Sequence, residues 1–331
     1  YLGIKHAMGV ASGTDALWLA LKALGIGSGD KVLTSPFTFF ATVSAVVNTG
    51  AQPVFADIDP ETFNLDPDRA EAVLDAPEGE RIKAIIPVHL YGQPADMEAF
   101  LFLAKRFNLW IVEDAAQAMG AEYQGRKAGT IGHIGCFSFF PTKNLGAFGD
   151  GGLVVTDNDQ LAEKVRLLKV HGASPKYHHH LVGTNSRLDA VQAAILQVKL
   201  KYLDKWISQR QACAATYDDG LKDLKRMLVP PYWTPDRSHT YHQYTLRVSG
   251  GNRDRLRSFL SERDVGTAVY YPLPVHLQPA LKKRDSSPGS FPEAERASRE
   301  VLCLPIFPEL TASEQNYILS ALKEWVKITE G

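Results

Sequence analysis

A lysine in an unusual setting is the first residue whose type and surroundings could do chemistry. Lys143 stands in CFSFFPTKNLGAFGDGG, residues 136–152, among aromatic and small side chains, with no charged residue before Asp150. Lysines normally lie on the surface in polar company, and taken alone Lys143 could equally be such a residue. Burial among apolar groups, however, lowers the pKa of a lysine and makes its amine a nucleophile that forms Schiff bases with carbonyl compounds.

A pair of carboxylates at the end of an apolar run is the second candidate. Glu113 and Asp114 close the segment LWIVEDA, residues 109–115, and are followed by small residues and Gln117. A buried carboxylate is costly unless a cation lies against it. A protonated heterocyclic nitrogen would serve as that cation, so the segment suggests a binding site for a ring.

Two further segments could complete a ligand site. In ASGTDAL, residues 11–17, a Ser-Gly-Thr turn leads into a helix, so Gly13 and Thr14 could offer N–H groups and a hydroxyl to a phosphate. An ordinary helix N-cap explains the same pattern. Phe39, near the start of another predicted helix, could cover a flat ligand or simply pack in the core.

Together these features match the functional groups of pyridoxal 5′-phosphate. The Ser-Gly-Thr turn would hold the phosphate, Asp114 the ring nitrogen and Lys143 the aldehyde, with Ser138 on the strand that leads to the lysine. Sites for this cofactor pair a Schiff-base lysine with an acidic partner for the pyridinium nitrogen. We expect no metal site, because the adjacent histidines at 178–180 cannot all face one ion and no CxxC pair accompanies them.

The elements that must position these residues alternate between strands and helices. The predicted strands are residues 31–35, 53–58, 82–90, 109–115, 133–140 and 152–157. The predicted helices are residues 15–27, 40–50, 66–75, 96–108 and 158–172. This alternation indicates an α/β fold with a parallel sheet covered on both faces. Ligands of such sheets bind at the carboxyl ends of the strands. The glycine-rich GIGSGD at 25–30 follows a helix, the wrong order for a dinucleotide fingerprint, and is interpreted as a turn.

The pattern changes from about Arg187. Residues 187–221 predict one or two long helices with a break near Lys205, and the rest of the chain predicts a smaller α+β domain. Its expected segments are strands at 241–248 and 267–272, a helix at 253–265, and two further elements at 291–305 and 311–328. We therefore expect a large cofactor-binding α/β domain over residues 1–205 and a small C-terminal domain over residues 206–331, joined through a Pro-rich surface connector.

Composition excludes several classes of function. The 331 residues contain 36 Lys and Arg against 37 Asp and Glu, so no net field attracts nucleic acid or an anionic membrane. No apolar run approaches the roughly 18 residues of a membrane helix, and the start shows no signal-peptide pattern. Three widely spaced cysteines argue against a disulfide framework and fit reduced thiols in the cytoplasm.

Seven segments, in order along the chain, resemble the DegT/DnrJ/EryC1/StrS group of sugar aminotransferases. They are SGTDAL, PFTFFAT, VFADIDPETFNLDP, IIPVHLYGQPADM, VEDAAQAMGAEYQGRKAG, FSFFPTKNLGAFGDGG and VGTNSRLDAVQAAIL. The likeness continues through YYPLPVHLQPA and LPIFPELT, so it covers almost the whole chain. It implies a fold-type I pyridoxal-phosphate enzyme with a mostly parallel central sheet sandwiched by helices and a smaller C-terminal α+β domain. Members usually carry some tens of residues before the position of Tyr1, so we expect that a preceding segment is missing.

The resemblance also implies roles by position. Lys143 would form the Schiff base, Asp114 would hold the pyridine nitrogen, and Gln117 would bond the ring hydroxyl. The other matching positions are Gly13, Thr14 and Ser138 at the phosphate, Phe39 on the ring, Asn185 reaching the phosphate from a neighbouring subunit, and Arg187 and His276 at the substrate. A homodimer with composite active sites follows. Arg187 could instead be a surface residue at the start of a helix.

The implied reaction is transamination of a nucleotide-linked keto-sugar for amino-sugar biosynthesis, with L-glutamate as the donor in a ping-pong scheme. The segments KYHHHLVGTNSRLDAVQAA and YYPLPVHLQPA look more like the enzymes of 3-keto-sugars than those of 4-keto-sugars. A dehydratase branch of the group carries histidine where Lys143 stands, so dehydration is the weaker alternative. A regulatory protein that keeps the cofactor pocket without turnover is another, disfavoured by the intact set of site residues.

Overall fold

Two sheets organise the chain in the computed structural model, which describes residues 1–281 and 287–330. The large sheet contains β1 (His6–Val10), β2 (Lys31–Thr34), β3 (Gln52–Phe55), β4 (Ile82–Ile86), β5 (Trp110–Asp114), β8 (Ile134–Ser138) and β9 (Gly152–Thr156). Its strand order is β1-β9-β8-β5-β4-β2-β3. The run from β3 to β8 is parallel, whereas β9 and β1 pair antiparallel at the other edge. The mostly parallel sheet expected from the sequence is thus confirmed.

Helices cover both faces of the large sheet. They are α1 (Gly13–Ala23), α2 (Phe40–Asn48), α3 (Pro67–Asp75), α4 (Met97–Phe107) and α5 (Asp159–Leu168). Because side chains alternate along a strand, Val112 packs with α1, α2 and α5 on one face, and its neighbour Ile111 packs with α3 and α4 on the other. Burial on both faces explains why these strands are continuous apolar runs.

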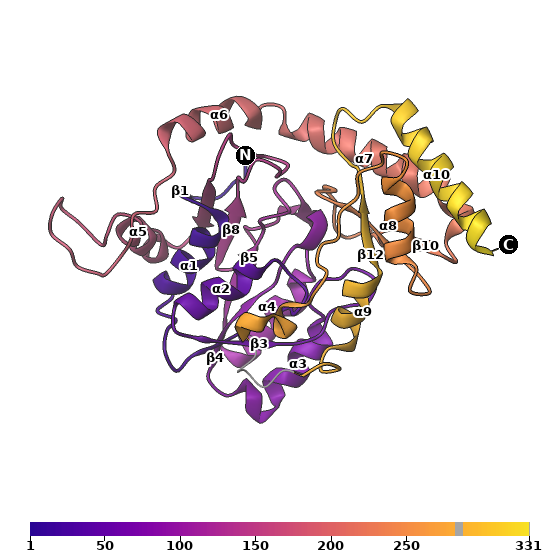
Figure 1. The fold of residues 1–331 in the computed structure, drawn as a ribbon. Coiled ribbons are helices and arrows are strands. Elements are labelled where there is room, and N and C mark those ends of the chain that lie inside the picture. Colours follow the sequence, from indigo (N-terminus) through magenta and orange to yellow (C-terminus); the bar gives the residue numbers. More distant parts are fainter. Residues whose placement is uncertain (282–286, 331) are drawn as a thin grey trace.

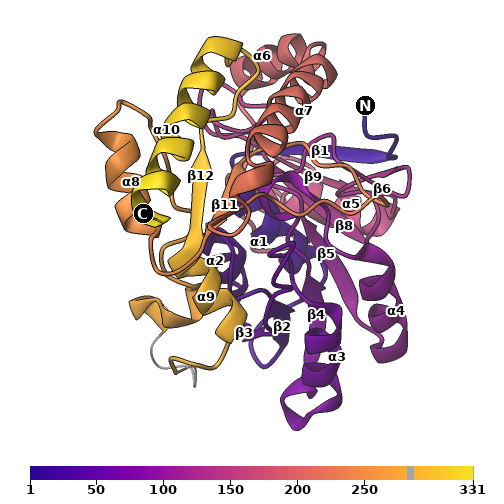
Figure 2. The same ribbon diagram turned by 90° about the vertical axis from the view of Figure 1, so that its right-hand side faces the viewer.

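The small sheet lies beyond two consecutive helices. These helices are α6 (Ala190–Leu200) and α7 (Leu203–Gly220), and they run along the top of the view from the large sheet to the small one (Figure 1). The small sheet has the order β10-β11-β12, formed by β10 (Leu228–Val229), β11 (Tyr244–Val248) and β12 (Val301–Leu304). Its core is shared with α7, α8 (Arg253–Ser261) and α10 (Ala312–Glu330). Figure 2 shows α8 and α10 beside β12, with α9 (Pro292–Glu300) below them.

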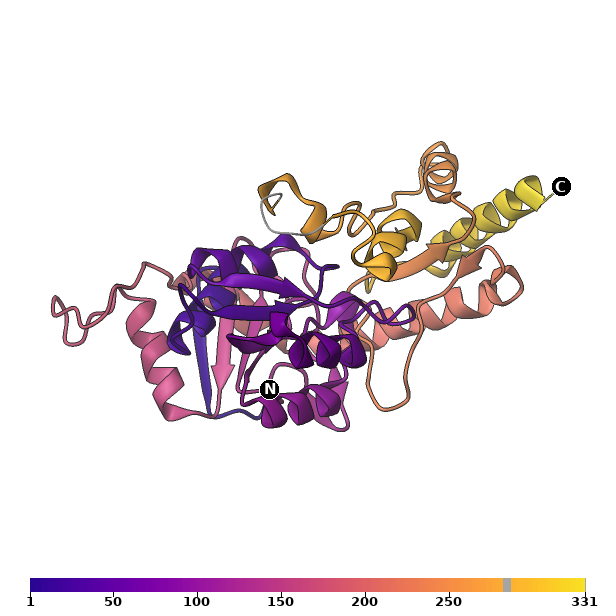
Figure 3. The ribbon, with the colours of Figure 1, turned by 90° about the horizontal axis from the view of Figure 1, so that it is seen from below.

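The remaining elements are short. They are the hairpin of β6 (Glu122–Tyr123) and β7 (Arg126–Lys127) and five 3-10 turns, η1 (Pro77–Gly79), η2 (Leu90–Gly92), η3 (Lys222–Leu224), η4 (Val275–Leu277) and η5 (Pro279–Leu281). No helix among the described residues is long and apolar enough to cross a membrane. Seen from below, the molecule is elongated, and a segment following α5 projects away from the large sheet (Figure 3).

Two sequence expectations about the elements are corrected, and one strand of the large sheet was missed. The strand expected at 267–272 is only an isolated bridge between Ala268 and Cys303, because Pro272 and Pro274 lack the N–H groups that would extend the ladder. The strand β1 was missed, since five residues containing a glycine give little periodicity. The long helical segment breaks at residues 201–202 rather than near 205, so the domain boundary that we place at 205 falls just inside α7 and stays a prediction.

Candidate active site

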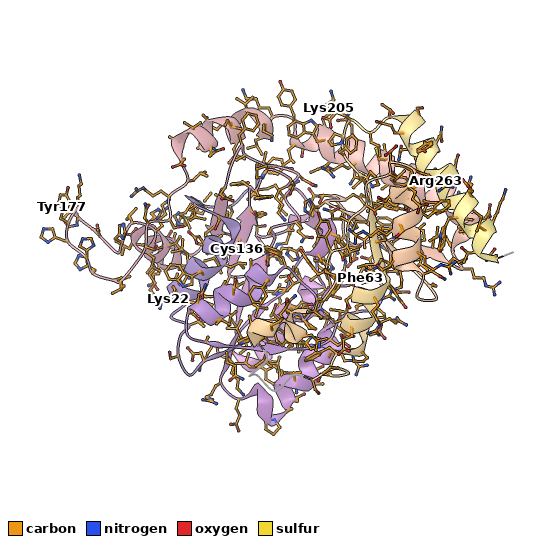
Figure 4. All side chains as sticks on the ribbon, viewed as in Figure 1. Lys22, Phe63, Cys136, Tyr177, Lys205 and Arg263 are labelled. Carbon is orange, nitrogen blue, oxygen red and sulfur yellow. The ribbon has the colours of Figure 1, made fainter. Side chains whose placement is uncertain are left out.

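A cavity of about 400 Å³ lies where the carboxyl ends of β5 and β8 meet the N-terminus of α1. The sequence candidates that line it are Gly13, Thr14, Phe39, Asp114, Gln117, Ser138 and Lys143. The part of the chain after α7 closes the other side with His242, Gln243, Tyr270 and Tyr271. Cys136, two residues before Ser138 on β8, marks this strand near the centre of the molecule in Figure 4. Segments far apart in sequence therefore share one space.

Lys143 stands in a turn directly after β8. Its backbone N–H donates to the carbonyl of Phe140 at 2.9 Å. The side-chain amide of the next residue, Asn144, donates to the carbonyl of Thr240 at 3.0 Å. Burial lowers the pKa of Lys143 from 10.5 to about 8, while the negative charge of Asp114 acts in the opposite direction. The protein therefore keeps a substantial fraction of this amine neutral near physiological pH, as a nucleophile requires.

Asp114 is buried at the carboxyl end of β5. The hydroxyl of Thr42 donates to one carboxylate oxygen at 2.8 Å, and the N–H of Ala116 donates to the other at 3.2 Å. Burial raises the pKa of Asp114, and these two bonds and the charge of Lys143 only partly counter it. A cation placed against this carboxylate from within the cavity would be strongly stabilised, and a pyridinium nitrogen has that charge.

Gln117 is fixed at both ends of its amide. Its carbonyl oxygen accepts from the backbone N–H of Tyr91 at 2.7 Å, and its nitrogen donates to the hydroxyl of Tyr271 at 3.0 Å. Since a primary amide has two N–H donors, one donor is left for a ligand in the cavity. Gln117 also joins the large sheet's side of the site to Tyr271, in the part of the chain after α7.

The Ser-Gly-Thr turn forms the opposite end of the cavity. Ser12 caps α1 by accepting from the N–H of Asp15 at 3.1 Å, so the ordinary capping interpretation is correct for this hydroxyl. The first N–H groups of the helix have no partner within it and carry its positive dipole end. Gly13 lies so close to β8 that an added Cβ would stand 2.7 Å from the Cβ of Ser138. The glycine is therefore required by space, and it opens a cradle that fits a phosphate.

Phe39 precedes α2 and leaves 58% of its surface exposed although it lines the cavity. Its ring centroid lies 6.1 Å from that of Tyr271, with the planes tilted by 35°. A core packing role does not explain such exposure. The geometry leaves one face of the ring accessible for stacking.

Three predicted residues do not join this cavity. Asn185 and Arg187 are exposed and lie outside its lining. His276 is buried in η4, where its Nε2 lies 3.3 Å from a carboxylate oxygen of Glu295 and its ring meets Phe291 edge-on at 4.8 Å. Within one chain, His276 supports the segment leading into α9 and does not line the cavity.

A buried anchor behind Asp114 was missed in the sequence. The Glu113 carboxylate accepts from the N–H groups of residues 129, 131 and 132 at 2.5–2.7 Å and lies 2.9 Å from Nε2 of His89. Nδ1 of His89 accepts from the N–H of Ala95 at 3.0 Å, so the proton of this neutral imidazole is on Nε2 and points to Glu113. Glu113 thus holds the end of β5 from the face opposite Asp114. The adjacent carboxylates in the sequence were the signal that could have revealed it.

The residues present fit pyridoxal 5′-phosphate. The cradle at Gly13, the accessible ring of Phe39, the buried carboxylate of Asp114 and the amine of Lys143 line one cavity, and these groups suit its phosphate, ring, ring nitrogen and aldehyde. Among the described residues, no cluster of His, Cys, Asp or Glu could hold a metal ion.

Comparison with known proteins agrees with this geometry. The chain is 51% identical to a "pleiotropic regulatory protein" of Geobacillus stearothermophilus, covering 99% of this chain and 87% of that protein. It is 46% identical to the dTDP-3-amino-3,4,6-trideoxy-α-D-glucose transaminase of Streptomyces venezuelae, covering 99% and 84%. Among solved structures, S. venezuelae DesV in complex with a ketimine intermediate matches with a TM-score of 0.94 and 46% identity, covering 98% of this chain and 86% of that one.

Family and cofactor follow from the same comparison. Other solved relatives include forms that hold pyridoxal phosphate and pyridoxamine phosphate, and aminotransferases of this kind use that cofactor. The model of the DegT/DnrJ/EryC1/StrS aminotransferase family matches residues 1–323. This chain therefore belongs to the DegT/DnrJ/EryC1/StrS aminotransferase family.

Proposed function

We propose that this protein transfers an amino group to a nucleotide-linked keto-sugar, with pyridoxal 5′-phosphate as cofactor, in amino-sugar biosynthesis. The observation that carries the proposal is the single cavity lined by Lys143, Asp114 and the Gly13 turn. The names of the relatives, several of which describe 3-amino or 3-oxo sugars linked to dTDP or UDP, favour amination at the 3-position over the 4-position.

Each residue of the site would act on a different part of the cofactor or substrate. When bound, the cofactor supplies an electron sink for the carbanion that forms at the substrate carbon. Lys143, whose pKa is about 8 because of burial, would carry the proton to and from that carbon as base and acid. Asp114 would keep the proton on the ring nitrogen, since its buried carboxylate gains most from a cationic partner. Gly13, Thr14 and Ser138 would hold the phosphate.

We propose L-glutamate as amino donor and a ping-pong order, because one cavity must accept the donor and the sugar in turn over the same lysine. We also propose a cytoplasmic location. The three cysteines, Cys136, Cys213 and Cys303, are buried free thiols, which fits a reducing compartment.

A homodimer with composite sites is the assembly that we propose. Lys143 is the one Lys or Arg that lines the cavity in the described part of the chain, whereas phosphates and carboxylates call for cations. Asn185 and Arg187 are exposed outside the cavity, with Asn185 paired to Val170 just after α5. The segment between Val170 and Asn185 projects outward, with Tyr177 near its tip (Figure 4). In α6 only Leu196 is fully buried, and a second copy packed against this helix would bring Asn185 and Arg187 to its partner's cavity.

A second candidate function is regulation by a cofactor-binding protein. It is favoured by one observation, the name of the relative from G. stearothermophilus. Lys143, Asp114 and Gln117 nevertheless occupy one cavity with the lysine pKa lowered to about 8. Other relatives at 42–46% identity are named as transaminases or aminotransferases, so we place catalysis first. Sugar dehydration is the weaker alternative, since Lys143 stands where the dehydratase branch of the group carries histidine.

The test uses the full chain loaded with pyridoxal phosphate. The loaded protein should be yellow, and addition of L-glutamate should convert its absorbance to that of the amine form of the cofactor. Lys143→Ala should lose the absorbance of the covalent cofactor, whereas Lys22→Ala, on the far part of α1, should not. A protein that stays colourless with added cofactor would refute the assignment. A yellow protein that no amino acid converts would favour the regulatory function.

A further inference from the structure

A buried histidine in the cavity wall has no partner. His242 lines the cavity and is 7% exposed. Its Nδ1 is buried without a hydrogen-bond partner. Its Nε2 is not among the buried unpaired atoms and has no hydrogen bond to any described residue, so Nε2 is the ring nitrogen open to the cavity. A buried polar group left unpaired costs roughly 1–3 kcal/mol, and most such groups in folded proteins are paired. An accessible Nε2 without a partner in the cavity wall therefore indicates a ligand that hydrogen-bonds to it.

The backbone around this histidine is held firmly, so the unpaired state is not a matter of a loose loop. Thr240 donates its N–H to the carbonyl of Gly92 at 2.9 Å, and Gln243 donates to the carbonyl of Tyr91 at 3.2 Å. The carbonyl of Tyr241 accepts from the guanidinium of Arg210 at 3.0 Å. These bonds on both sides of His242 fix the backbone that carries its ring.

The same segment is tied to the catalytic lysine. Asn144, the residue after Lys143, donates its side-chain amide to the carbonyl of Thr240 at 3.0 Å. His242 is close enough to Lys143 for the positive charge of the lysine to act on its imidazole. Both residues line the same cavity, so a ligand bound there can contact both.

The charge of the imidazole decides what kind of group it can bind. Burial, then the positive charges of Lys143 and Arg210, hold the pKa of His242 well below its usual range. A neutral imidazole has one donor and one acceptor, which suits a hydroxyl, whereas a carboxylate is bound best by a cation. The neighbouring lining residues Gln243, Tyr270 and Tyr271 are neutral hydrogen-bonding groups as well.

We propose that His242 is a specificity-determining residue that hydrogen-bonds a sugar hydroxyl beside the reacting carbon. The inference rests on the proposed function, because it concerns the same cavity. It proposes that the wall containing His242 contacts the sugar and not the amino acid. His242 would contact the sugar in its half of the ping-pong reaction and leave the glutamate half unaffected.

The experiment measures the two half-reactions separately on the loaded full-length protein. One probe is L-glutamate. The other is dTDP-3-amino-3,4,6-trideoxy-α-D-glucose, which keeps one free ring hydroxyl next to the amino carbon, and its UDP-linked 3-amino counterpart serves as a second nucleotide. We expect His242→Phe to slow the amino-sugar half-reaction about 10- to 100-fold, the effect of one lost hydrogen bond to a buried group, and to change the glutamate half less than about threefold. His242→Gln, whose amide can replace Nε2, should restore much of the rate.

Two controls separate binding from folding. His239→Asn changes another buried histidine of the same segment, whose Nδ1 accepts from the N–H of Tyr241 at 2.9 Å outside this cavity, and it should leave both half-reactions near wild type. Binding of the amino sugar to Lys143→Ala protein, which cannot complete transamination, should weaken by the same 10- to 100-fold on adding His242→Phe, as measured by calorimetry. A 2-deoxy probe should lose this difference between the two proteins, because the hydroxyl is gone.

Each result decides the matter. The inference would be overturned if His242→Phe slowed both half-reactions equally or slowed neither of them. The proposed function would still stand in that case, provided that the wild-type protein turns over both probes. An unchanged difference with the 2-deoxy probe would overturn it too. If wild type reacts with glutamate but with neither amino sugar, the proposed function itself is wrong and the inference is overturned with it.

Discussion

The lowered pKa of Lys143 makes a quantitative prediction about its reactivity. At an ordinary pKa of 10.5, about one amine in 3,000 is neutral at pH 7, whereas at the pKa of about 8 that burial gives Lys143 about one in ten is neutral. The neutral amine attacks the aldehyde, so at pH 7 Lys143 should react with pyridoxal phosphate roughly 300-fold faster than a lysine of ordinary pKa and equal access.

The assay follows covalent labelling of Lys143 from pH 6 to pH 10. Cofactor-free protein is mixed with pyridoxal phosphate, quenched with borohydride at short times, and digested for mass spectrometry of the Lys143 peptide. We expect the initial rate to rise about tenfold per pH unit below pH 8 and to level off above it. Labelling of all other lysines together serves as the internal reference in the same samples.

A substitution of Asp114 tests what sets the pKa of Lys143. The negative charge of Asp114 raises the pKa of Lys143 against the effect of burial, so Asp114→Asn should move the levelling point to lower pH. A Lys143 labelling rate that keeps rising to pH 10 in the wild-type protein would refute the buried, partly neutral amine. A levelling point that stays in place in Asp114→Asn would refute the coupling between the two residues.

Three further predictions concern the supports of the site. Gly13→Ala should weaken cofactor binding about tenfold or more in a fluorescence titration, because the new Cβ meets Ser138 at 2.7 Å; unchanged affinity would contradict the cradle. Glu113→Gln should lower the free energy of unfolding by about 3 kcal/mol in urea, because an amide N–H₂ would face backbone N–H donors that now share two carboxylate oxygens; full stability would contradict the anchor. Thr42→Val should lower kcat by removing the hydroxyl that donates to Asp114 at 2.8 Å, while Thr42→Ser should keep it, and equal rates for the two variants would argue against this contact.

The sequence by itself was enough to identify the large-domain half of the site. Lys143, Asp114 and Gly13 each stand at a junction between a strand and a helix or turn, and such junctions are set by local periodicity and by turn residues. In a parallel sheet the carboxyl ends of the strands meet at one edge. Finding residues at those ends was therefore equivalent to placing them together, and the structure brings all three to one cavity.

The tertiary structure alone decided what closes the other side. His242 and Tyr271 come from segments more than 100 residues beyond Asp114 in the chain, and no local pattern says that they face it. For His276, in contrast, the sequence suggested a site residue that the fold of a single chain places outside the cavity. Its position in the sequence suggested a contact with substrate, but packing against Phe291 and Glu295 buries it away from the cavity of its own chain.

The difference has a physical reason. Strands, helices and their caps depend on residues a few positions apart, so a short stretch such as residues 136–152 carries its own turn and presents its own lysine. The pKa of that lysine, the unpaired imidazole of His242 and the anchor at Glu113 depend on burial and on charges brought close by the fold. Burial and proximity are properties of the packed chain as a whole. The sequence therefore determined which groups could react. The tertiary structure determined the ionisation state of those groups and the residues that face them across the cavity.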